Sequence, residues 1–149
     1  MMIAIGCDHG GYKLKEEIKK YLEELNIEYK DFGTYNEERT DHPIFAKEVA
    51  KSVQSKECDK GILICTSGAG MAIDANKFKG IRSAVCYNEK TAKQAKEHLD
   101  VNILALPGGD LNISQAVQII RAWIGSEFLG GRYLERLQMI EKIEDENMK

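Results

Sequence analysis

The stretch Gly61-Ile-Leu-Ile-Cys65, followed at once by Thr66-Ser67-Gly68-Ala69-Gly70, decides the fold. An apolar run with no polar alternation is typical of a strand covered by helices on both faces of a parallel sheet. The glycine-containing loop leads directly into a helical pattern over residues 71–77. A strand, a tight loop and a helix in this order predict one unit of an α/β fold.

The same alternation extends over the rest of the chain. Other strand patterns cover residues 2–6, 28–32, 82–86 and 102–106. Amphipathic helical patterns cover residues 12–25, 43–55, 89–99, 113–124 and 133–144. Five strands with intervening helices predict a five-stranded parallel sheet wrapped on both sides. We expect a single domain over residues 1–149, with a last helix at about 133–144 and a solvated tail.

Composition and charge exclude several classes of protein. The chain has 149 residues, 43% hydrophobic and 30% charged, with a net charge of −3. This is an ordinary globular composition without the basic field expected for nucleic-acid binding. No apolar run approaches the ~18 residues of a membrane span. The first residues, MMIAIGCDHGG, lack the basic region of a signal peptide, and four widely spaced cysteines are typical of reduced thiols. We therefore expect a cytoplasmic protein.

Candidate catalytic residues follow the strands, because ligands of parallel sheets bind at the carboxyl ends of the strands. Cys65 stands before a helix N-terminus, where the helix dipole favours a thiolate and free amides favour an anion. Asp8 and His9 follow the first strand and pair a carboxylate with an imidazole. Each also fits a structural role, Cys65 as a small core residue, Asp8 as a helix cap and His9 as an exposed side chain.

Three further residues have the chemistry of a sugar-phosphate site. His98 is a potential general acid near a helix C-terminus, and Arg132 and Arg136 share one helical face, where two guanidinium groups suit a phosphate. A histidine is also favourable at a helix C-terminus for structural reasons, and paired arginines also occur on solvated faces. These residues together are consistent with proton transfer on a small phosphorylated polyol, but their spacing does not determine which reaction is catalysed.

Known motifs do not explain the Cys65 loop. A cysteine phosphatase needs an arginine at the sixth residue after its nucleophile, and Met71 stands there. The segment Gly68-Ala-Gly70-Met-Ala-Ile73 lacks the third glycine of a dinucleotide fingerprint, and no Gly-Lys-Ser/Thr of a P-loop occurs in the chain. The four cysteines and three histidines show no zinc-ligand spacing.

Several motifs in order resemble type B ribose-5-phosphate isomerase, a family that also includes galactose-6-phosphate and allose-6-phosphate isomerases. They are GCDHGG (6–11), ERTDHP (38–43), ICTSGAG (64–70), ANK (75–77), GIR (80–82), NILA (102–105) and GGR (130–132). The resemblance implies a Rossmann-like α/β/α sandwich and a homodimer or tetramer with shared active sites. It implies interconversion of ribose 5-phosphate and ribulose 5-phosphate through a cis-enediolate, with no metal or nucleotide cofactor.

The resemblance also implies roles for individual residues. Cys65 would be the base that moves the C2 proton, Asp8 and His98 would assist ring opening with His98 as the proton donor, and Ser67 would be a further catalytic residue. The amides of Thr66, Ser67, Gly68, Ala69 and Gly70 would hold the enediolate oxygen. His9, Arg132 and Arg136 would bind the phosphate, some of them from the partner subunit. Met71 replaces a glutamate that serves as the base in other members, which places the chain in the cysteine-base branch.

Three departures from the family pattern affect the expected substrate. Ser67 replaces a threonine, Leu99 replaces an asparagine, and Gly109 stands where an arginine is frequent, with Asp110 beside it. Ser67 keeps the hydroxyl, but the polar contacts at positions 99 and 109 are lost, which predicts weaker dependence on phosphate and a wider substrate range, including free aldoses such as allose or ribose, with psicose as the ketose of allose. The alternatives are a galactose-6-phosphate isomerase subunit and a non-catalytic sugar-phosphate-binding protein.

Overall fold

The computed structural model describes residues 1–148 and contains one parallel sheet. Its strands are β1 (Met2–Cys7), β2 (Glu28–Asp31), β3 (Lys60–Cys65), β4 (Ser83–Val85) and β5 (Ile103–Pro107). They lie in the order β2-β1-β3-β5-β4, and every neighbouring pair is parallel. The five-stranded parallel sheet predicted from the apolar runs is therefore confirmed.

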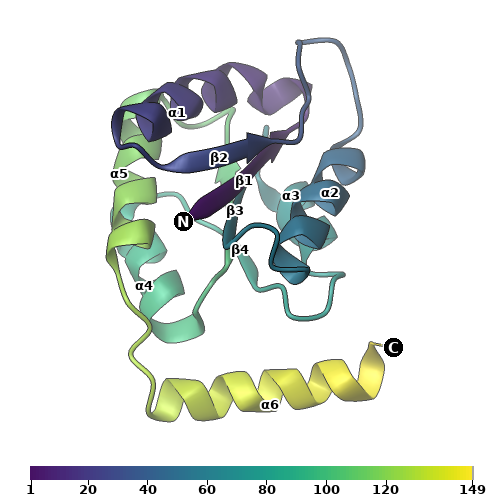
Figure 1. Cartoon of the computed structure of the whole chain (residues 1–149), viewed down its shortest axis with the longest axis vertical. Helices are drawn as coiled ribbons and strands as arrows, with labels where there is room; N and C mark the ends of the chain where they lie inside the picture. The colour runs from purple at the N-terminus through teal and green to yellow at the C-terminus, as the bar shows by residue number, and fades with distance from the viewer. Residues whose placement is uncertain (149) are drawn as a thin grey trace.

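Helices cover both faces of the sheet (Figure 1). One face packs against α1 (Tyr12–Glu24), α4 (Glu89–Leu99) and α5 (Ile113–Gly125). The other face packs against α2 (His42–Gln54) and α3 (Ala69–Ala75). Since successive strand side chains point to opposite faces, Ile64 of β3 belongs to the first layer and Cys65 to the second. The expected three-layer α/β/α sandwich is confirmed.

The last helix, α6 (Arg132–Asn147), lies apart from these layers along the lower edge of the molecule (Figure 1). It begins one residue before and ends three residues beyond the expected 133–144. Leu137 is its only buried side chain within the described part of the chain. Its C-terminal half is attached to the body by Glu144, which accepts a hydrogen bond from the Gly80 amide, and by the Lys79–Asp145 ion pair.

Other boundaries differ slightly from expectation. Helix α3 begins two residues before the expected residue 71, immediately after Gly68, and β4 covers only three of the expected five residues. A short 3-10 turn at His9–Gly11 follows β1. Helices α4 and α5 begin with reciprocal side-chain caps, Asn88 with Thr91 and Asn112 with Gln115. Such caps satisfy amides that a helix start leaves free. No helix in residues 1–148 combines the length and hydropathy required to span a membrane.

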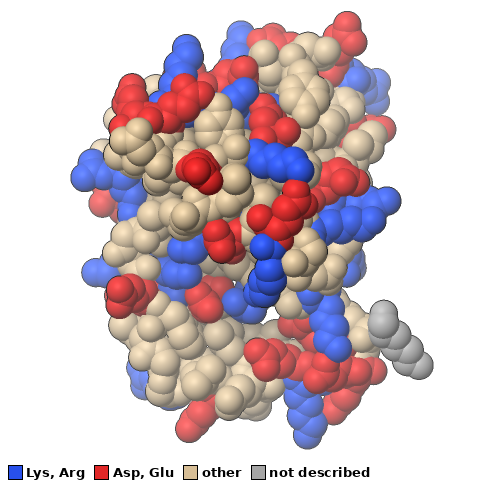
Figure 2. Space-filling model, viewed as in Figure 1, with Lys and Arg blue, Asp and Glu red and all other residues tan. Residues whose placement is uncertain are grey.

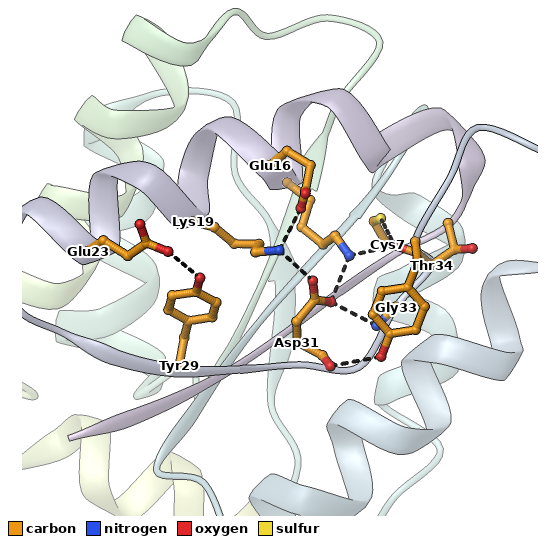
Figure 3. Close-up of polar contacts among 10 residues, drawn as sticks. Cys7, Glu16, Lys19, Glu23, Tyr29, Asp31, Gly33 and Thr34 are labelled. Carbon is orange, nitrogen blue, oxygen red and sulfur yellow. Dashed lines mark hydrogen bonds and ion pairs between the residues drawn. The ribbon is translucent and has the colours of Figure 1, made fainter.

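Hydrogen bonds from Lys19 and Gly33 converge on Asp31 at the end of β2 (Figure 3). A further donor to Asp31 is a buried cation that was not expected from the helical pattern. Lys15 of α1 is fully buried, and its Nζ donates to Asp31 Oδ1 at 2.7 Å and to the carbonyl oxygen of Thr34 at 2.5 Å. Burial alone would raise the pKa of Asp31, but hydrogen bonds from Lys15, Gly33 and Lys19 hold it below its ordinary value. This network fixes the chain where it leaves β2.

Candidate active site

The loop after β3 surrounds the Cys65 thiol with backbone donors. Cys65 is 5% exposed, and the Gly68 amide donates to its Sγ at 3.1 Å. Gly68 has φ +75°, and an added Cβ would lie 3.0 Å from the Leu106 backbone, so the turn requires glycine. Helix α3 begins at the next residue, so the free amides of its first turn lie beside the thiol. A hydrogen bond from an amide stabilises a thiolate, and the remaining amides suit an oxyanion.

The other three thiols have a different environment. Burial raises the pKa of Cys7 to about 12 and that of Cys86 to about 11, and it also raises the pKa of Cys58. A buried thiol with a raised pKa is a poor nucleophile and a poor base near neutral pH. Of the four cysteines, Cys65 is therefore the one whose surroundings suit chemistry.

Asp8 and His9 follow β1, so they lie at the same C-terminal end of the strands as the thiol loop. Asp8 is 7% exposed, and its carboxylate accepts a hydrogen bond from the Gly10 amide at 2.9 Å, so it caps the 3-10 turn and keeps a fixed orientation. His9 is exposed, and its Nδ1 lies 3.2 Å from both the amide nitrogen and the carbonyl oxygen of Thr40. Both contacts occupy Nδ1 and leave Nε2 to face a phosphate oxygen.

Two glycines pack directly against Thr66. An added Cβ at Gly10 would lie 2.3 Å from Thr66 Oγ1, and one at Gly109 would lie 2.9 Å from Thr66 Cγ2. The Gly109 amide also donates to the Thr66 carbonyl at 3.0 Å. The loops after β1, β3 and β5 are thus in contact, and position 109 has no room for a side chain without displacement of Thr66.

A second group of candidate residues gathers around Tyr133 of α6. The His98 and Tyr133 rings stack with centroids 4.4 Å apart, and the guanidinium carbons of Arg132 and Arg136 lie 5.1 Å and 5.7 Å from the Tyr133 ring centre. We call His98, Arg132, Tyr133 and Arg136 the basic cluster. Leu99, 44% exposed, borders the same hollow of about 390 Å³ as His98 and Arg136. Tyr133 had no predicted role, because its alignment depends on how α6 meets α4.

The thiol loop lies at the C-terminal ends of the strands, which we call the thiol edge of the sheet. The basic cluster lies at the opposite edge, where β5 begins. Cys65 is in register with Pro107, the last residue of β5. His98 lies at the end of α4, which leads through Asp100 into the first residue of β5, Ile103. The length of β5 alone separates these positions by roughly 13 Å. A single chain therefore brings Asp8, His9, Cys65 and the glycine loop together, but it does not bring His98, Arg132 or Arg136 to them.

His42 also lies at the thiol edge, and no role was predicted for it from the sequence. It is the first residue of α2, and its Nδ1 is hydrogen-bonded to Asp74 Oδ2 of α3. Its ring lies over Gly70, where an added Cβ would stand 2.8 Å from Cε1 and 2.9 Å from Nε2. The sequence signal was a histidine in a segment that follows a strand, but the pairing with Asp74 depends on the packing of α2 against α3.

Comparison with known proteins places this geometry in a family. A family model described as Ribose/Galactose Isomerase matches residues 3–140. The chain belongs to the ribose/galactose isomerase family. The family resemblance found in the sequence motifs, and the assignment to the isomerases, are thereby confirmed.

Individual members of the ribose/galactose isomerase family are similar over nearly the whole chain. Ribose-5-phosphate isomerase B of Escherichia coli (strain K12) is 44% identical over 142 residues, which cover 95% of each chain. The structure of Clostridium thermocellum ribose-5-phosphate isomerase B superimposes with a TM-score of 0.96 at 46% identity, covering 98% of this chain and 99% of that one. That of the Mycoplasma genitalium enzyme with bound ribulose-5-phosphate has a TM-score of 0.93 at 35% identity, with 98% and 97% coverage.

Proposed function

We propose that this chain interconverts ribose 5-phosphate and ribulose 5-phosphate, with Cys65 as the base that moves a proton between C2 and C1. The observation that carries the proposal is the Cys65 thiol, held by the Gly68 amide at the mouth of a loop of free amides. Relatives named ribose-5-phosphate isomerase B support the substrate, and one of them was solved with ribulose-5-phosphate.

The residues divide the reaction among them. Asp8, fixed by the Gly10 amide, and His98 open the furanose ring, with His98 as the proton donor. The Cys65 thiolate then removes the C2 proton, and the amides of residues 66–70 receive the negative charge that develops on the substrate oxygen. Preorganised donors of this kind contribute about 3 kcal/mol each to transition-state stabilisation. His9, Arg132 and Arg136 hold the phosphate, whose binding energy keeps the reacting carbons in register.

The active site is completed by a second copy of the chain in this proposal. Within one copy, the basic cluster lies at the wrong edge of the sheet to reach Cys65. Helix α6 exposes Leu134, Met139 and Ile143, and Figure 2 shows an uncharged area around its N-terminal half. Between α6 and the body lies a mostly apolar hollow of about 350 Å³. An apolar arm that carries the missing site residues suits a homodimer, or a tetramer of such dimers, with shared sites.

Proton NMR of ribose 5-phosphate in heavy water tests the chemistry. With the wild-type protein we expect ketose to appear together with deuterium at C2 of the remaining aldose, and with Cys65→Ala we expect both to be lost. Isomerisation that survives in Cys65→Ala would overturn the base assignment. No turnover by the wild type would overturn the substrate, and allose and its 6-phosphate would be tested next.

Subunit mixing tests the shared site. Cys65→Ala and His98→Asn are each expected to be inactive as homodimers. If one site uses Cys65 of one copy and His98 of the other, a hybrid dimer has one site with both substitutions and one site with neither. Mixed and refolded variants should then recover about a quarter of wild-type activity at equal amounts, because half the dimers are hybrids with one intact site. No recovery in dimers shown to be mixed would mean that both residues serve the same site from one copy.

Leu99 and Gly109 favour a wider substrate range within this function. Leu99 presents an exposed apolar side chain beside His98, and Gly109 leaves no side chain to contact a phosphate. We therefore propose that free aldoses such as allose are also converted, here to psicose, at lower efficiency. Steady-state kinetics with paired phosphorylated and free sugars test this range, and a strict requirement for phosphate would contradict it. A galactose 6-phosphate activity that needs a second, unlike chain would support the alternative subunit role.

A further inference from the structure

The His42–Asp74 pair is a second acid–base unit at the thiol edge, outside the residues assigned to the reaction above. His42 belongs to α2 and Asp74 to α3, so the hydrogen bond between them joins two helices of the same layer. The Asp74 side chain is 17% exposed and that of His42 is 40% exposed. The carboxylate is therefore largely covered, whereas the imidazole has an open side.

Asp74 determines which ring nitrogen of His42 is available. A carboxylate accepts the Nδ1 proton, so in the neutral ring the lone pair is on Nε2. Among residues 1–148 the structure gives Nε2 no hydrogen-bond partner. The arrangement is that of an imidazole oriented by a carboxylate, which is a common way to prepare a side chain for proton transfer.

The position of the ring relates it to the reacting oxygens. The Nε2 edge lies over Gly70, and any side chain at position 70 would collide with the ring. Gly70 is in the first turn of α3, two residues after the amide that donates to Cys65 Sγ. The loop that holds the thiol at one end therefore has an oriented imidazole over its other end, beside the amides that suit the substrate oxyanion.

An aldose–ketose isomerisation needs a second proton transfer besides the one at carbon. After C2 loses its proton, the negative charge is on O1, and only C2 can accept a proton from the thiol. Ketose forms only when the O2 hydroxyl proton has moved to O1, because the charge on O2 then directs protonation to C1. Within the proposed function, the residues assigned above do not include a carrier for this proton.

We propose that His42 carries the hydroxyl proton between O2 and O1 of the enediolate and that Asp74 is its positioning residue. Nε2 of the neutral ring takes the proton from O2–H, which leaves the O2 oxyanion and an imidazolium. The imidazolium then gives the same proton to O1, so the ring is neutral before and after the step. Asp74 keeps Nδ1 protonated and stabilises the intermediate charge.

The test separates carbon exchange from ketose formation. His42→Gln keeps an amide near the place of Nε2 but cannot carry a proton, Asp74→Asn removes the carboxylate, and Glu48→Gln on the exposed side of α2 is the matched control. Each protein is incubated with ribose 5-phosphate in heavy water, and the deuterium at C2 of the aldose is measured per ketose formed. Thermal unfolding midpoints report whether each variant is folded.

We expect His42→Gln to lower kcat about 100-fold with KM within twofold of the wild-type value, and to raise the ratio of exchange to ketose at least tenfold. Asp74→Asn should change both in the same direction, with a loss of about tenfold in kcat, and Glu48→Gln should match the wild type. The proposal is overturned if a folded His42→Gln keeps wild-type kcat, or if exchange and ketose formation fall together. If His42→Gln does not fold, the ratio in Asp74→Asn decides in the same way. Absence of both exchange and ketose with the wild type would instead overturn the proposed function.

Discussion

The close packing of Gly10 against Thr66 predicts that a methyl group added at position 10 would distort the thiol loop. In Gly10→Ala the new Cβ would lie 2.3 Å from Thr66 Oγ1, whereas contacts below 3.0 Å essentially do not occur. Thr66 must therefore retreat by about 0.7 Å, the difference between these two distances. Thr66 directly follows Cys65, and its carbonyl oxygen accepts a hydrogen bond from the Gly109 amide. A shift of Thr66 therefore disturbs both the thiol and the loop after β5.

The expected magnitude follows from the cost of overpacking, which is about 1–3 kcal/mol for an added methyl group in a well-packed region. A shift of this size in catalytic geometry costs up to about 100-fold in rate. We expect Gly10→Ala to lower kcat/KM for ribose 5-phosphate about 10–100-fold and the unfolding midpoint by roughly 3–10 °C. Isomerisation assays and thermal unfolding of the same samples measure both quantities.

The double variant Gly10→Ala/Thr66→Ala is the decisive control. Removal of Oγ1 relieves the 2.3 Å contact and leaves the Thr66 amide nitrogen at 3.3 Å from the new Cβ, a distance that a shift of a few tenths of an ångström accommodates. We expect the double variant to recover most of the activity lost in Gly10→Ala, with Thr66→Ala alone within a few fold of the wild type. Wild-type activity in Gly10→Ala would refute the reasoning, because Thr66 would then escape by a change of rotamer at no cost.

Three other expectations concern reactivity and stability. Iodoacetamide at pH 8 should modify Cys65 before Cys7 or Cys86, whose pKa values burial raises to about 12 and about 11, and peptide mass spectrometry that finds either of those labelled first would contradict this. Burial and the nearby Lys96 lower the pKa of Lys60 to about 8 from 10.5, so between those pH values the unfolded chain binds more protons and the contribution of Lys60 to stability rises with pH. Lys60→Met should therefore be more stable than the wild type at pH 7. The difference in the free energy of unfolding, measured by urea denaturation, should shrink toward pH 10.5, and a difference that does not change with pH would contradict the lowered pKa of Lys60. Lys15→Met should lower the free energy of unfolding by about 2–3 kcal/mol, because it removes one of the two cations that pair with the largely buried Asp31 carboxylate and the donor to the Thr34 carbonyl, and a loss below about 1 kcal/mol in urea denaturation would be inconsistent with that account.

The strands and the thiol loop were predictable because they depend on local patterns. The structure of the apolar run before Cys65 and of the loop that follows it depends on neighbouring residues, and both lie where they were expected. Burial of Lys15 was not predictable from helical spacing, because an amphipathic pattern over residues 12–25 assigns charged side chains to the solvent-facing side of the helix. Lys15 is buried because Asp31 and the Thr34 carbonyl, which are distant in sequence, meet it.

The candidate site was predictable in its residue types but not in its assembly. His98 could be recognised as a potential general acid near a helix C-terminus, but its place at the opposite edge from Cys65 depends on the direction in which α4 returns across the sheet. The stacking of His98 on Tyr133 likewise needs the turn of the chain into α6. These are relations between elements, and no single stretch of sequence contains them.

The distance between the two edges of the sheet has a consequence for how such genes can diverge. Where two copies complete each other's sites, a copy that loses its thiol can still serve a partner through its arginines, and a copy that loses its arginines can still serve through its thiol. After a gene duplication, the two products can therefore decay in complementary halves without loss of function. A single-gene enzyme with this layout is one pair of neutral losses away from an obligate pair of unlike subunits.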